Sequence, residues 1–282
     1  MIRLRPPTRE DGPRAAEIVI AVDVAEVGEP DYSLEDLHDE WGEPGFDLAE
    51  DAVVAEADGE IIGYAHFRGG DLLACVHPER QGEGAGSALL DWAERRARER
   101  GEDRLRQGIG DRAHAARALL EARGYSVVRS YYRMERPLGD EGEPGFRAVR
   151  ADDELFAIWE AAFSRNADYE PRSEEAWTQR HLHAHNVDFE TSRIEPGRGF
   201  TLVRRWEEAV AYVEELAVHP DHAGRGLGGA LLTATFAAAR ANGYRHVTLS
   251  VASDNPNALR LYERVGMTQR WRIDDYHKPL PD

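Results

Sequence analysis

The sequence lacks residues and segments on which several classes of protein depend. It has one cysteine, Cys75, among 282 residues, so no internal disulfide can form. Cys75 lies in the apolar run 72–76, where a thiol resists ionisation, and this favours a buried core residue over a nucleophile. No stretch of 18 apolar residues occurs, and residues 1–6 contain no apolar core of a secretion signal. We therefore expect a cytoplasmic protein without a membrane segment.

Positive charge is also scarce. The 35 lysine and arginine residues stand against 53 acidic ones, which gives a formal net charge of −18, and Lys278 is the single lysine. A duplex nucleic acid needs a clustered cationic surface, so this composition excludes that class of partner. The acidity favours a cationic acceptor such as an amine only weakly, and a surface adapted for solubility is the simpler explanation.

What the sequence does contain is an internal repeat at a constant offset of 142 residues. His77-Pro78 returns as His219-Pro220, and the same offset continues to a final Pro-Leu pair. The further pairs are Gly84 and Gly226, Gly86 and Gly228, Gly101 and Gly243, Leu119 and Leu261, Gly124 and Gly266, and Pro137-Leu138 and Pro279-Leu280. The repeat predicts a tandem duplication with halves at 1–138 and 146–282. The linker between them, 139–145, is rich in glycine, proline and acid.

Both halves show the same order of predicted elements. A short alternating strand, at 2–5 or 146–150, precedes an amphipathic helix. Strands then flank Asp58-Gly59 in the first half and Pro196-Gly197 in the second, as in hairpins. Later strands alternate with helices. Antiparallel strands followed by strands joined through helices predict an α/β fold with a mixed sheet in each half.

A glycine-rich turn follows the fourth predicted strand of each half and leads directly into a helix. The turns read Q-G-E-G-A-G at 81–86 and A-G-R-G-L-G at 223–228. Glycines allow a tight turn whose backbone N–H groups point at an anion, and the helix N-terminus adds positive potential, so a diphosphate would fit there. Neither turn has the spacing of a dinucleotide-binding fold or the Gly-Lys-Ser/Thr of a P-loop.

These motifs resemble those of a known family. His219-Pro220 and the turn 223–228, followed by Ala-Leu-Leu, are similar to motif A of the GCN5-related N-acetyltransferases (GNAT), whose loop amides hold the coenzyme A diphosphate. Residues 254–267, D-N-P-N-A-L-R-L-Y-E-R-V-G-M, resemble motif B of that family. The first half is similar in motif A and degenerate in motif B. The resemblance implies two tandem acyl-CoA N-acyltransferase domains, and the layout with an altered first half is similar to that of mycothiol synthases.

The resemblance assigns acetyl-CoA and the chemistry to the second half. The expected coenzyme contacts are Leu216, Ala217, Val218, Gly224, Arg225, Gly226, Leu227, Gly228, Gly229 and Asn255. The backbone near 216–218 would face the thioester carbonyl, and Asn255 would cap the following helix or touch the coenzyme. Tyr262, at the tyrosine position of motif B, would protonate the departing thiolate; the alternative is a core-facing aromatic of an amphipathic helix.

The base is expected close by. The family's frequent glutamate on this strand aligns with Tyr212, and Glu214 and Glu215 follow it. A regular strand would point these two acids to opposite faces, so that one of them faces the cleft and takes the proton of the amine, through water. The alternative is an exposed acidic pair at a sheet edge.

The offset provides an internal control for these assignments. Tyr262 corresponds to Leu120, Glu214 to Leu72, Glu215 to Leu73 and Asn255 to Ala113, so each side chain assigned to chemistry is apolar in the first half. Glu83 replaces Arg225 in the turn and would repel a diphosphate. We predict that the first half is non-catalytic, as a support or a weakened coenzyme site.

Three histidines precede the strands of the second half. His181 and His185 would share a helical face, as zinc ligands can, with His183 between them. No third ligand stands at a recognisable spacing, so we expect a polar helix near the acceptor pocket and no metal.

The sequence thus predicts an enzyme that transfers acetyl from acetyl-CoA to a primary amine of a small molecule or a protein. The alternatives are a mycothiol-synthase-like acetylation of a thiol precursor and a non-catalytic acyl-CoA sensor. A sensor has no need of Tyr262 or of the Glu214 and Glu215 pair.

Overall fold

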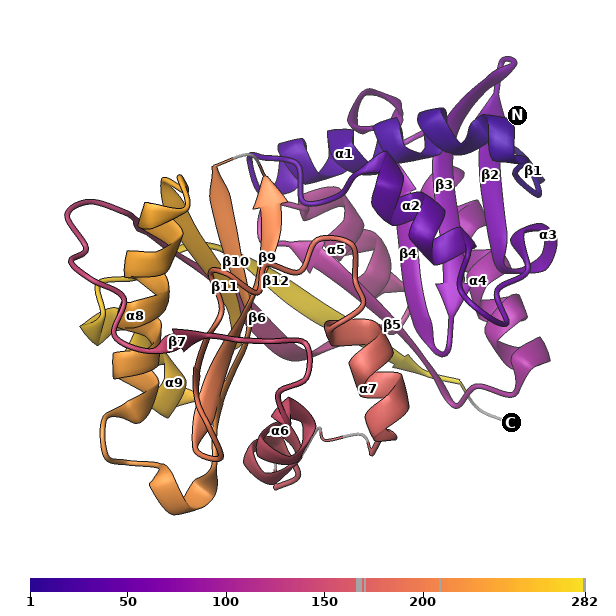
Figure 1. Cartoon of the computed structure of the whole chain (residues 1–282). Helices are drawn as coiled ribbons and strands as arrows, with labels where there is room; N and C mark the ends of the chain where they lie inside the picture. The colour runs from indigo at the N-terminus through magenta and orange to yellow at the C-terminus, as the bar shows by residue number, and fades with distance from the viewer. Residues whose placement is uncertain (166–168, 170, 208, 281–282) are drawn as a thin grey trace. The chain divides into compact units, whose positions relative to one another are not determined.

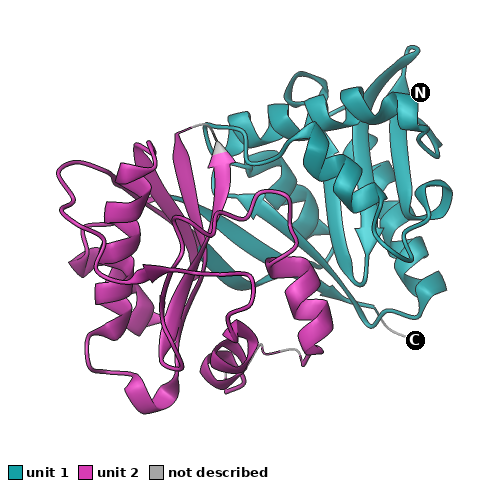
Figure 2. Cartoon of the chain, in the orientation of Figure 1, with its two compact units in different colours: residues 1–131, 271–282 teal, residues 132–270 magenta. Residues whose placement is uncertain are grey.

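The computed structural model describes residues 1–165, 169, 171–207 and 209–280 (Figure 1). The chain forms two compact units (Figure 2): unit 1 comprises residues 1–131 and 271–282, and unit 2 comprises residues 132–270. These units differ from the predicted halves 1–138 and 146–282. The last strand of each half contributes residues to both units, since β6 (Ser126–Pro137) enters unit 2 at residue 132 and β12 (Thr268–Pro279) enters unit 1 at residue 271.

Strand pairing is the physical reason for this difference. Within unit 1, β12 runs antiparallel to β5 (Arg104–Gly110), with Ile273 opposite Gly110 and Pro279 opposite Arg104. Within unit 2, β6 neighbours β11 (His246–Ala252). Each sheet therefore takes its closing strand from the other repeat, which a hydrophobic pattern cannot specify because it does not name the partner of a strand.

Unit 1 contains a mixed sheet in the order β1-β2-β3-β4-β5-β12. Its other strands are β1 (Arg3–Arg5), β2 (Ala52–Ala57), β3 (Glu60–Arg68) and β4 (Asp71–Val76), and its helices are α1 (Gly12–Glu26), α2 (Leu34–Trp41), α3 (Leu48–Asp51), α4 (Ala85–Arg100) and α5 (His114–Ala122). The first four strands are antiparallel, and β4 runs parallel to β5. The predicted hairpin at Asp58-Gly59 is confirmed, because it joins β2 to β3 with positive φ at both residues.

Helices cover both faces of this sheet (Figure 1). Alternate residues of β2 belong to different core clusters: Val53 and Ala55 pack with residues of α4 and α5, and Ala52 and Val54 pack with residues of α1 and α2. Side chains of a strand alternate between faces, so the two clusters lie on opposite sides of the sheet. This is the layered arrangement expected of an α/β unit.

Unit 2 repeats the same order of elements. Its sheet has the order β6-β11-β10-β9-β8-β7. The remaining elements are β7 (Arg147–Ala148), α6 (Leu155–Phe163), α7 (Glu174–His181), β8 (Arg193–Glu195), β9 (Gly199–Glu207), β10 (Val210–Val218), α8 (Leu227–Ala241) and α9 (Pro256–Arg264). Short 3-10 helices precede α1 (Arg9–Asp11), the turn of unit 1 (Pro78–Arg80) and the turn of unit 2 (Pro220–His222). The predicted mixed α/β fold of both repeats is confirmed.

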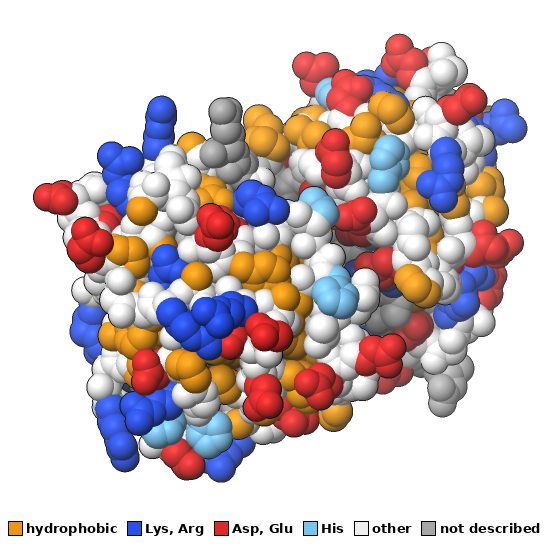
Figure 3. All heavy atoms as spheres, viewed as in Figure 1, with side chains coloured by type: hydrophobic (Ala, Val, Ile, Leu, Met, Phe, Trp, Pro, Cys, Tyr) orange, Lys and Arg blue, Asp and Glu red, His pale blue; other side chains and the backbone are white. Residues whose placement is uncertain are grey.

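The surface reflects the acidic composition. On the face shown in Figure 3, acidic side chains are spread widely and interspersed with arginines. Within the described ranges, no helix is both long enough and apolar enough to span a bilayer.

Candidate active site

The glycine-rich turn of unit 2 leads from β10 into α8. Gly224 and Gly226 have φ of +72° and +85°, a left-handed conformation that glycine adopts without strain. Gly226 is the N-cap of α8, and the first N–H groups of a helix have no partner within the helix. Gly228 allows close packing, since a Cβ there would lie 3.3 Å from Leu261 Cδ2 of α9. The turn thus has the donors and the potential to hold a diphosphate.

A β-bulge interrupts β10 just before the predicted thioester position. Val213 lies opposite Val203 of β9 and Glu215 lies opposite the next residue, Leu202, so Glu214 is an additional residue in β10. The equivalent strand of unit 1 has no such interruption.

Unit 1 shows which residues correspond. There, Leu73 of β4 lies opposite His66 and Leu72 opposite Phe67, in unbroken register. Glu215 therefore corresponds to Leu73, as the offset predicted. Leu72 corresponds to Val213, and the predicted match of Leu72 with Glu214 is wrong because the bulge inserts a residue.

The bulge also corrects the predicted orientation of the two acids. The Nδ1 atom of His181, the last residue of α7, lies 3.2 Å from Glu214 Oε1 and 3.9 Å from Glu215 Oε1. Both carboxylates therefore lie on the same side of β10. A regular strand alternates its side chains, whereas the additional residue of a bulge brings two successive ones to one side.

Glu214 is held by cationic and polar partners. Arg204 of β9 donates from Nε to Oε2 and from Nη2 to Oε1, both at 2.5 Å. Burial alone would raise the pKa of Glu214, but the contacts with His181 and Arg204 outweigh it, and the pKa lies below its ordinary value. A carboxylate held in this way is a poor acceptor of a substrate proton.

Glu215 is in the opposite situation. Its Oε1 accepts a hydrogen bond from Trp159 Nε1 of α6 at 3.3 Å. Burial, followed by the negative charge of Glu214, raises the pKa of Glu215 to about 8. The Trp159 hydrogen bond and the charges of Arg172 and Arg180 act against this rise without cancelling it. Two adjacent carboxyls whose environments push their pKa values apart are typical of sites where one of them moves protons.

Tyr262 lies on α9 and is 9% exposed. It packs in the hydrophobic core of unit 2, and Ala258, Leu261 and Val265 of the same helical face pack there too. Burial raises the pKa of Tyr262, and the charges of Glu215 and Tyr212 add to the rise. Its hydroxyl therefore keeps its proton at neutral pH, as a proton donor must. The core contacts and the electrostatic interaction with Glu215 coexist in this residue.

The other predicted residues of unit 2 lie at helix ends or beyond them. Asn255 Oδ1 accepts a hydrogen bond from Ala258 N at 3.1 Å and so caps α9, whereas its contact with a coenzyme stays a prediction. Because α7 ends at His181, the predicted helical face shared with His185 does not form. Within the part of the chain that the structure describes, no group of three or more His, Cys, Asp or Glu side chains could hold a metal.

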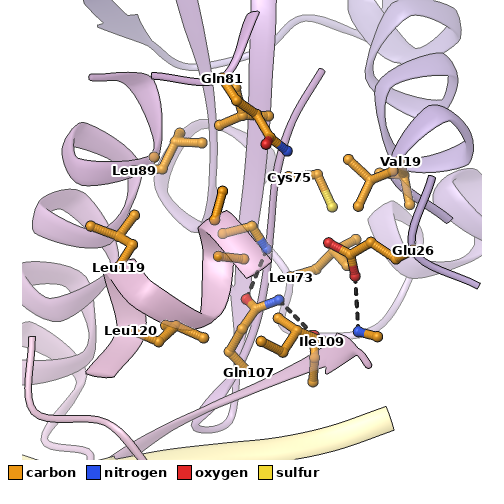
Figure 4. Close-up of a pocket in the computed structure, with 18 of the residues that line it drawn as sticks. Val19, Glu26, Leu73, Cys75, Gln81, Leu89, Gln107, Ile109, Leu119 and Leu120 are labelled. Atoms are coloured by element: carbon orange, nitrogen blue, oxygen red, sulfur yellow. Dashed lines mark hydrogen bonds between the residues drawn. The ribbon is translucent and has the colours of Figure 1, made fainter. Parts of the chain in front are cut away.

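Unit 1 contains a cavity of about 520 Å³ between β4, β5, α1 and the turn 81–86 (Figure 4). Leu73 and Leu120, the counterparts of Glu215 and Tyr262, line it. Cys75 also lines it, and burial, followed by the charges of Asp23 and Glu26, holds the pKa of its thiol well above the ordinary value. The prediction of a buried cysteine is confirmed, and the raised pKa disfavours the thiolate.

Two acids that line this cavity were missed from the sequence. Burial raises the pKa of Asp23 to about 7, and Asp31 and Glu26 contribute by their charge. Burial also raises the pKa of Glu26, although its Oε2 accepts a hydrogen bond from Gly110 N at 2.8 Å. The sequence contained a signal for these acids, because they stand three residues apart and interrupt the apolar face of the predicted first helix.

The turn of unit 1 differs from the prediction in one respect. Arg80 binds Glu83 with two hydrogen bonds, from Nε to Oε1 at 2.7 Å and from Nη2 to Oε2 at 3.1 Å. This exposed ion pair largely neutralises Glu83, so the repulsion of a diphosphate is weaker than the sequence indicated.

In unit 2 the strands β10 and β11 separate beside a glycine turn, next to a partly buried acid and a buried tyrosine. This is the arrangement expected from the acyltransferase family that the motifs resemble. The model of the Acetyltransferase (GNAT) family matches residues 10–125 and 152–267. The chain belongs to this family, with two tandem domains, and the resemblance stated from the motifs is confirmed.

Known proteins agree with this assignment. The mycothiol acetyltransferase of Thermomonospora curvata is 32% identical over 82% of this chain and 83% of its own length. That of Actinosynnema mirum is 30% identical over 79% of this chain and 81% of its own. A GCN5-related N-acetyltransferase from Sphaerobacter thermophilus superposes with a TM-score of 0.78 at 27% identity, covering 100% of this chain and 96% of its own.

A tandem GNAT protein from the clavulanic acid biosynthesis pathway, at 17% identity, shares the fold with a TM-score of 0.70, over 100% of this chain and 99% of its own. Membership of the family makes this protein an acetyl-CoA-dependent N-acetyltransferase with an amine-bearing acceptor, as predicted. The sensor alternative is thereby set aside.

Proposed function

We propose that unit 2 performs the acetyl transfer and that Glu215, not Glu214, is the base. The observation that carries this proposal is the contrast between the two acids at the bulge. Glu214 is tied to Arg204 and His181, whereas the side chain of Glu215 is 15% exposed, lies beside Trp159 and interacts electrostatically with Tyr262. The turn 224–229 is the proposed site for the diphosphate of acetyl-CoA.

The proposed reaction uses each group once. The carboxylate of Glu215 takes a proton from the substrate ammonium, directly or through a water molecule, and the freed amine nitrogen bonds to the thioester carbonyl carbon. The backbone N–H of Leu216 donates a hydrogen bond to the oxyanion that forms. When the carbon–sulfur bond breaks, the Tyr262 hydroxyl gives its proton to the thiolate, and the nitrogen of the new amide loses its second proton, which restores the Tyr262 hydroxyl through water. The proton on Glu215 returns to solvent, so that both side chains end as they began.

We propose the amine precursor of mycothiol as the first acceptor to test. The support is that relatives matching about four fifths of this chain are mycothiol acetyltransferases. An acidic site also favours an acceptor that arrives as a cation. Other small-molecule amines and protein amines are the next acceptors to compare.

The test replaces Glu215 by Gln and measures the release of coenzyme A thiol with a panel of amines that includes this precursor. We expect Glu215→Gln to lower kcat by about 10²-fold or more, because a general base contributes about 10²–10⁴-fold. In the unmodified enzyme kcat/KM should rise with pH up to and through about 8, since the carboxylate form is the active one, and Glu215→Gln should remove this rise.

Asp23→Asn in unit 1 is the matched control. Asp23 is also a partly buried carboxyl with a raised pKa beside a cavity, yet we expect its substitution to change kcat by less than about 3-fold. Loss of turnover in Asp23→Asn together with normal turnover in Glu215→Gln would assign the chemistry to unit 1.

A further inference from the structure

Strands β4 and β5 of unit 1 separate beside the cavity, and a side chain fills the opening. Their register contains one pair, Asp71 with Arg106, whereas β10 and β11 of unit 2 pair at three positions before they part. Gln107, the residue after Arg106, is 5% exposed and lines the cavity (Figure 4).

Both ends of the Gln107 carboxamide are engaged. Oε1 accepts a hydrogen bond from the backbone N–H of Ala74 at 3.0 Å, and Nε2 donates to the backbone oxygen of Gly108 at 3.0 Å; dashed lines mark both bonds in Figure 4. The second bond fixes the direction of the amide, so the oxygen rather than the nitrogen faces β4. A buried amide with a hydrogen bond at each end is costly to displace.

Comparison of the two repeats shows which backbone N–H the Gln107 Oε1 atom binds. Ala74 lies one residue beyond Leu73, as Leu216 lies one residue beyond Glu215, so Ala74 N–H corresponds to the N–H that we assign to the oxyanion in unit 2. Gln107 corresponds to Leu249, which is buried in the apolar core of unit 2 and has no acceptor atom in its side chain. The two repeats therefore differ in whether this strand position offers a hydrogen-bond acceptor to that N–H.

We propose that Gln107 is a built-in substitute for the thioester carbonyl and a determinant of which unit is active. A carboxamide oxygen and a thioester oxygen are both carbonyl acceptors. An Ala74 N–H that is bonded to the Gln107 oxygen is therefore not available to a thioester oxygen. Unit 1 thus lacks the donor for acetyl transfer even when its turn is intact. The proposal rests on the function proposed for unit 2, because the role of Ala74 N–H is inferred from that of Leu216.

The first experiment introduces a carboxamide at the corresponding position of unit 2, residue 249, in the full chain. Leu249→Gln should place a carboxamide oxygen on Leu216 N–H and lower kcat by about 10²-fold or more, the usual effect of losing one oxyanion donor. The Kd for free coenzyme A, which has no thioester oxygen, should change by less than about 3-fold, a split that a merely loosened core would not produce. Leu249→Met, which keeps an apolar side chain of similar size, is the control and should retain normal kcat.

The second experiment measures the Ala74 amide of unit 1 itself, and it tests the proposal even if Leu249→Gln does not fold. Hydrogen exchange of the Ala74 amide should be at least about tenfold faster in Gln107→Leu, because its acceptor is gone, and unchanged in Gln107→Glu, which keeps an acceptor oxygen. Slow exchange in Gln107→Leu, or equally fast exchange in both variants, overturns the proposal.

Glu215→Gln in the same assay separates the two proposals. If Leu249→Gln keeps a normal kcat while Glu215→Gln loses turnover, the proposed role of Gln107 is wrong and the proposed function of unit 2 stands. Normal kcat in both variants overturns the proposed function of unit 2 and this inference with it.

Discussion

Tyr262 is the residue on which departure of the thiolate depends in this account. Tyr262→Phe removes the hydroxyl and keeps the ring in its core position, so we expect kcat to fall by about 10²-fold while coenzyme A binds as before. Turnover by release of thiol and binding by calorimetry measure the two effects separately.

Tyr244→Phe is the matched control in the same unit. Its hydroxyl donates to Asp188 Oδ2 at 2.7 Å and is also buried, at a position that has no assigned role. We expect it to cost about 1.5–3 kcal/mol of stability, the net value of a hydrogen bond to a charged group, and to leave kcat unchanged. Normal turnover in Tyr262→Phe would remove the hydroxyl from the mechanism.

At the scale of residues, the sequence identified Tyr262, Glu214 and Glu215 as candidates because they stand within or beside recognisable motifs. It could not choose between the two acids. That choice depends on Arg204 and Trp159, which lie on other elements and are brought to the acids only by folding. Long-range neighbours of this kind leave no local pattern in a sequence.

Among the elements, the two glycine turns offer a matched pair of substitutions. Gly84 and Gly226 both have left-handed φ, +93° and +85°, and a Cβ at either would meet nothing within 4 Å. Gly84→Ala and Gly226→Ala therefore carry the same backbone strain, about 1–2 kcal/mol.

We expect both variants to show a similar fall in melting temperature but only Gly226→Ala to weaken acetyl-CoA use, because the turn of unit 2 positions the thioester. The measurements are thermal unfolding and kcat/KM for acetyl-CoA. An equal loss of kcat/KM in the two variants would show that both turns serve the reaction.

The elements were largely predictable, and the bulge was not. Glycine spacing and alternating apolar residues located the turns and most strands, because these signals are local. The additional residue at Glu214 is visible only in the register of β10 against β9. An alignment at constant offset does not contain this additional residue, and it therefore pairs Leu72 with Glu214 instead of Val213.

For the whole molecule, the sequence predicted the duplication into two repeats, and the compact units differ from these repeats because each takes its closing strand from the other one. Strands 126–137 and 268–279 are repeats of one another, so their patterns are equally suited to either sheet. The structure gives residues 132–137 to unit 2 and residues 271–279 to unit 1. A fragment ending at residue 138 would lack the strand that pairs with β5, and the division of labour has to be tested in the full chain.

The most direct measurement is the turnover of the full chain that carries both Glu215→Gln and Tyr262→Phe, with unit 1 unaltered. If unit 2 performs the chemistry, release of coenzyme A thiol in the presence of an amine should fall by at least about 10³-fold, since the base and the acid are both gone. Retention of more than about a tenth of normal turnover, a loss of less than about 1.4 kcal/mol of transition-state stabilisation, would contradict the account and place the reaction elsewhere in the molecule.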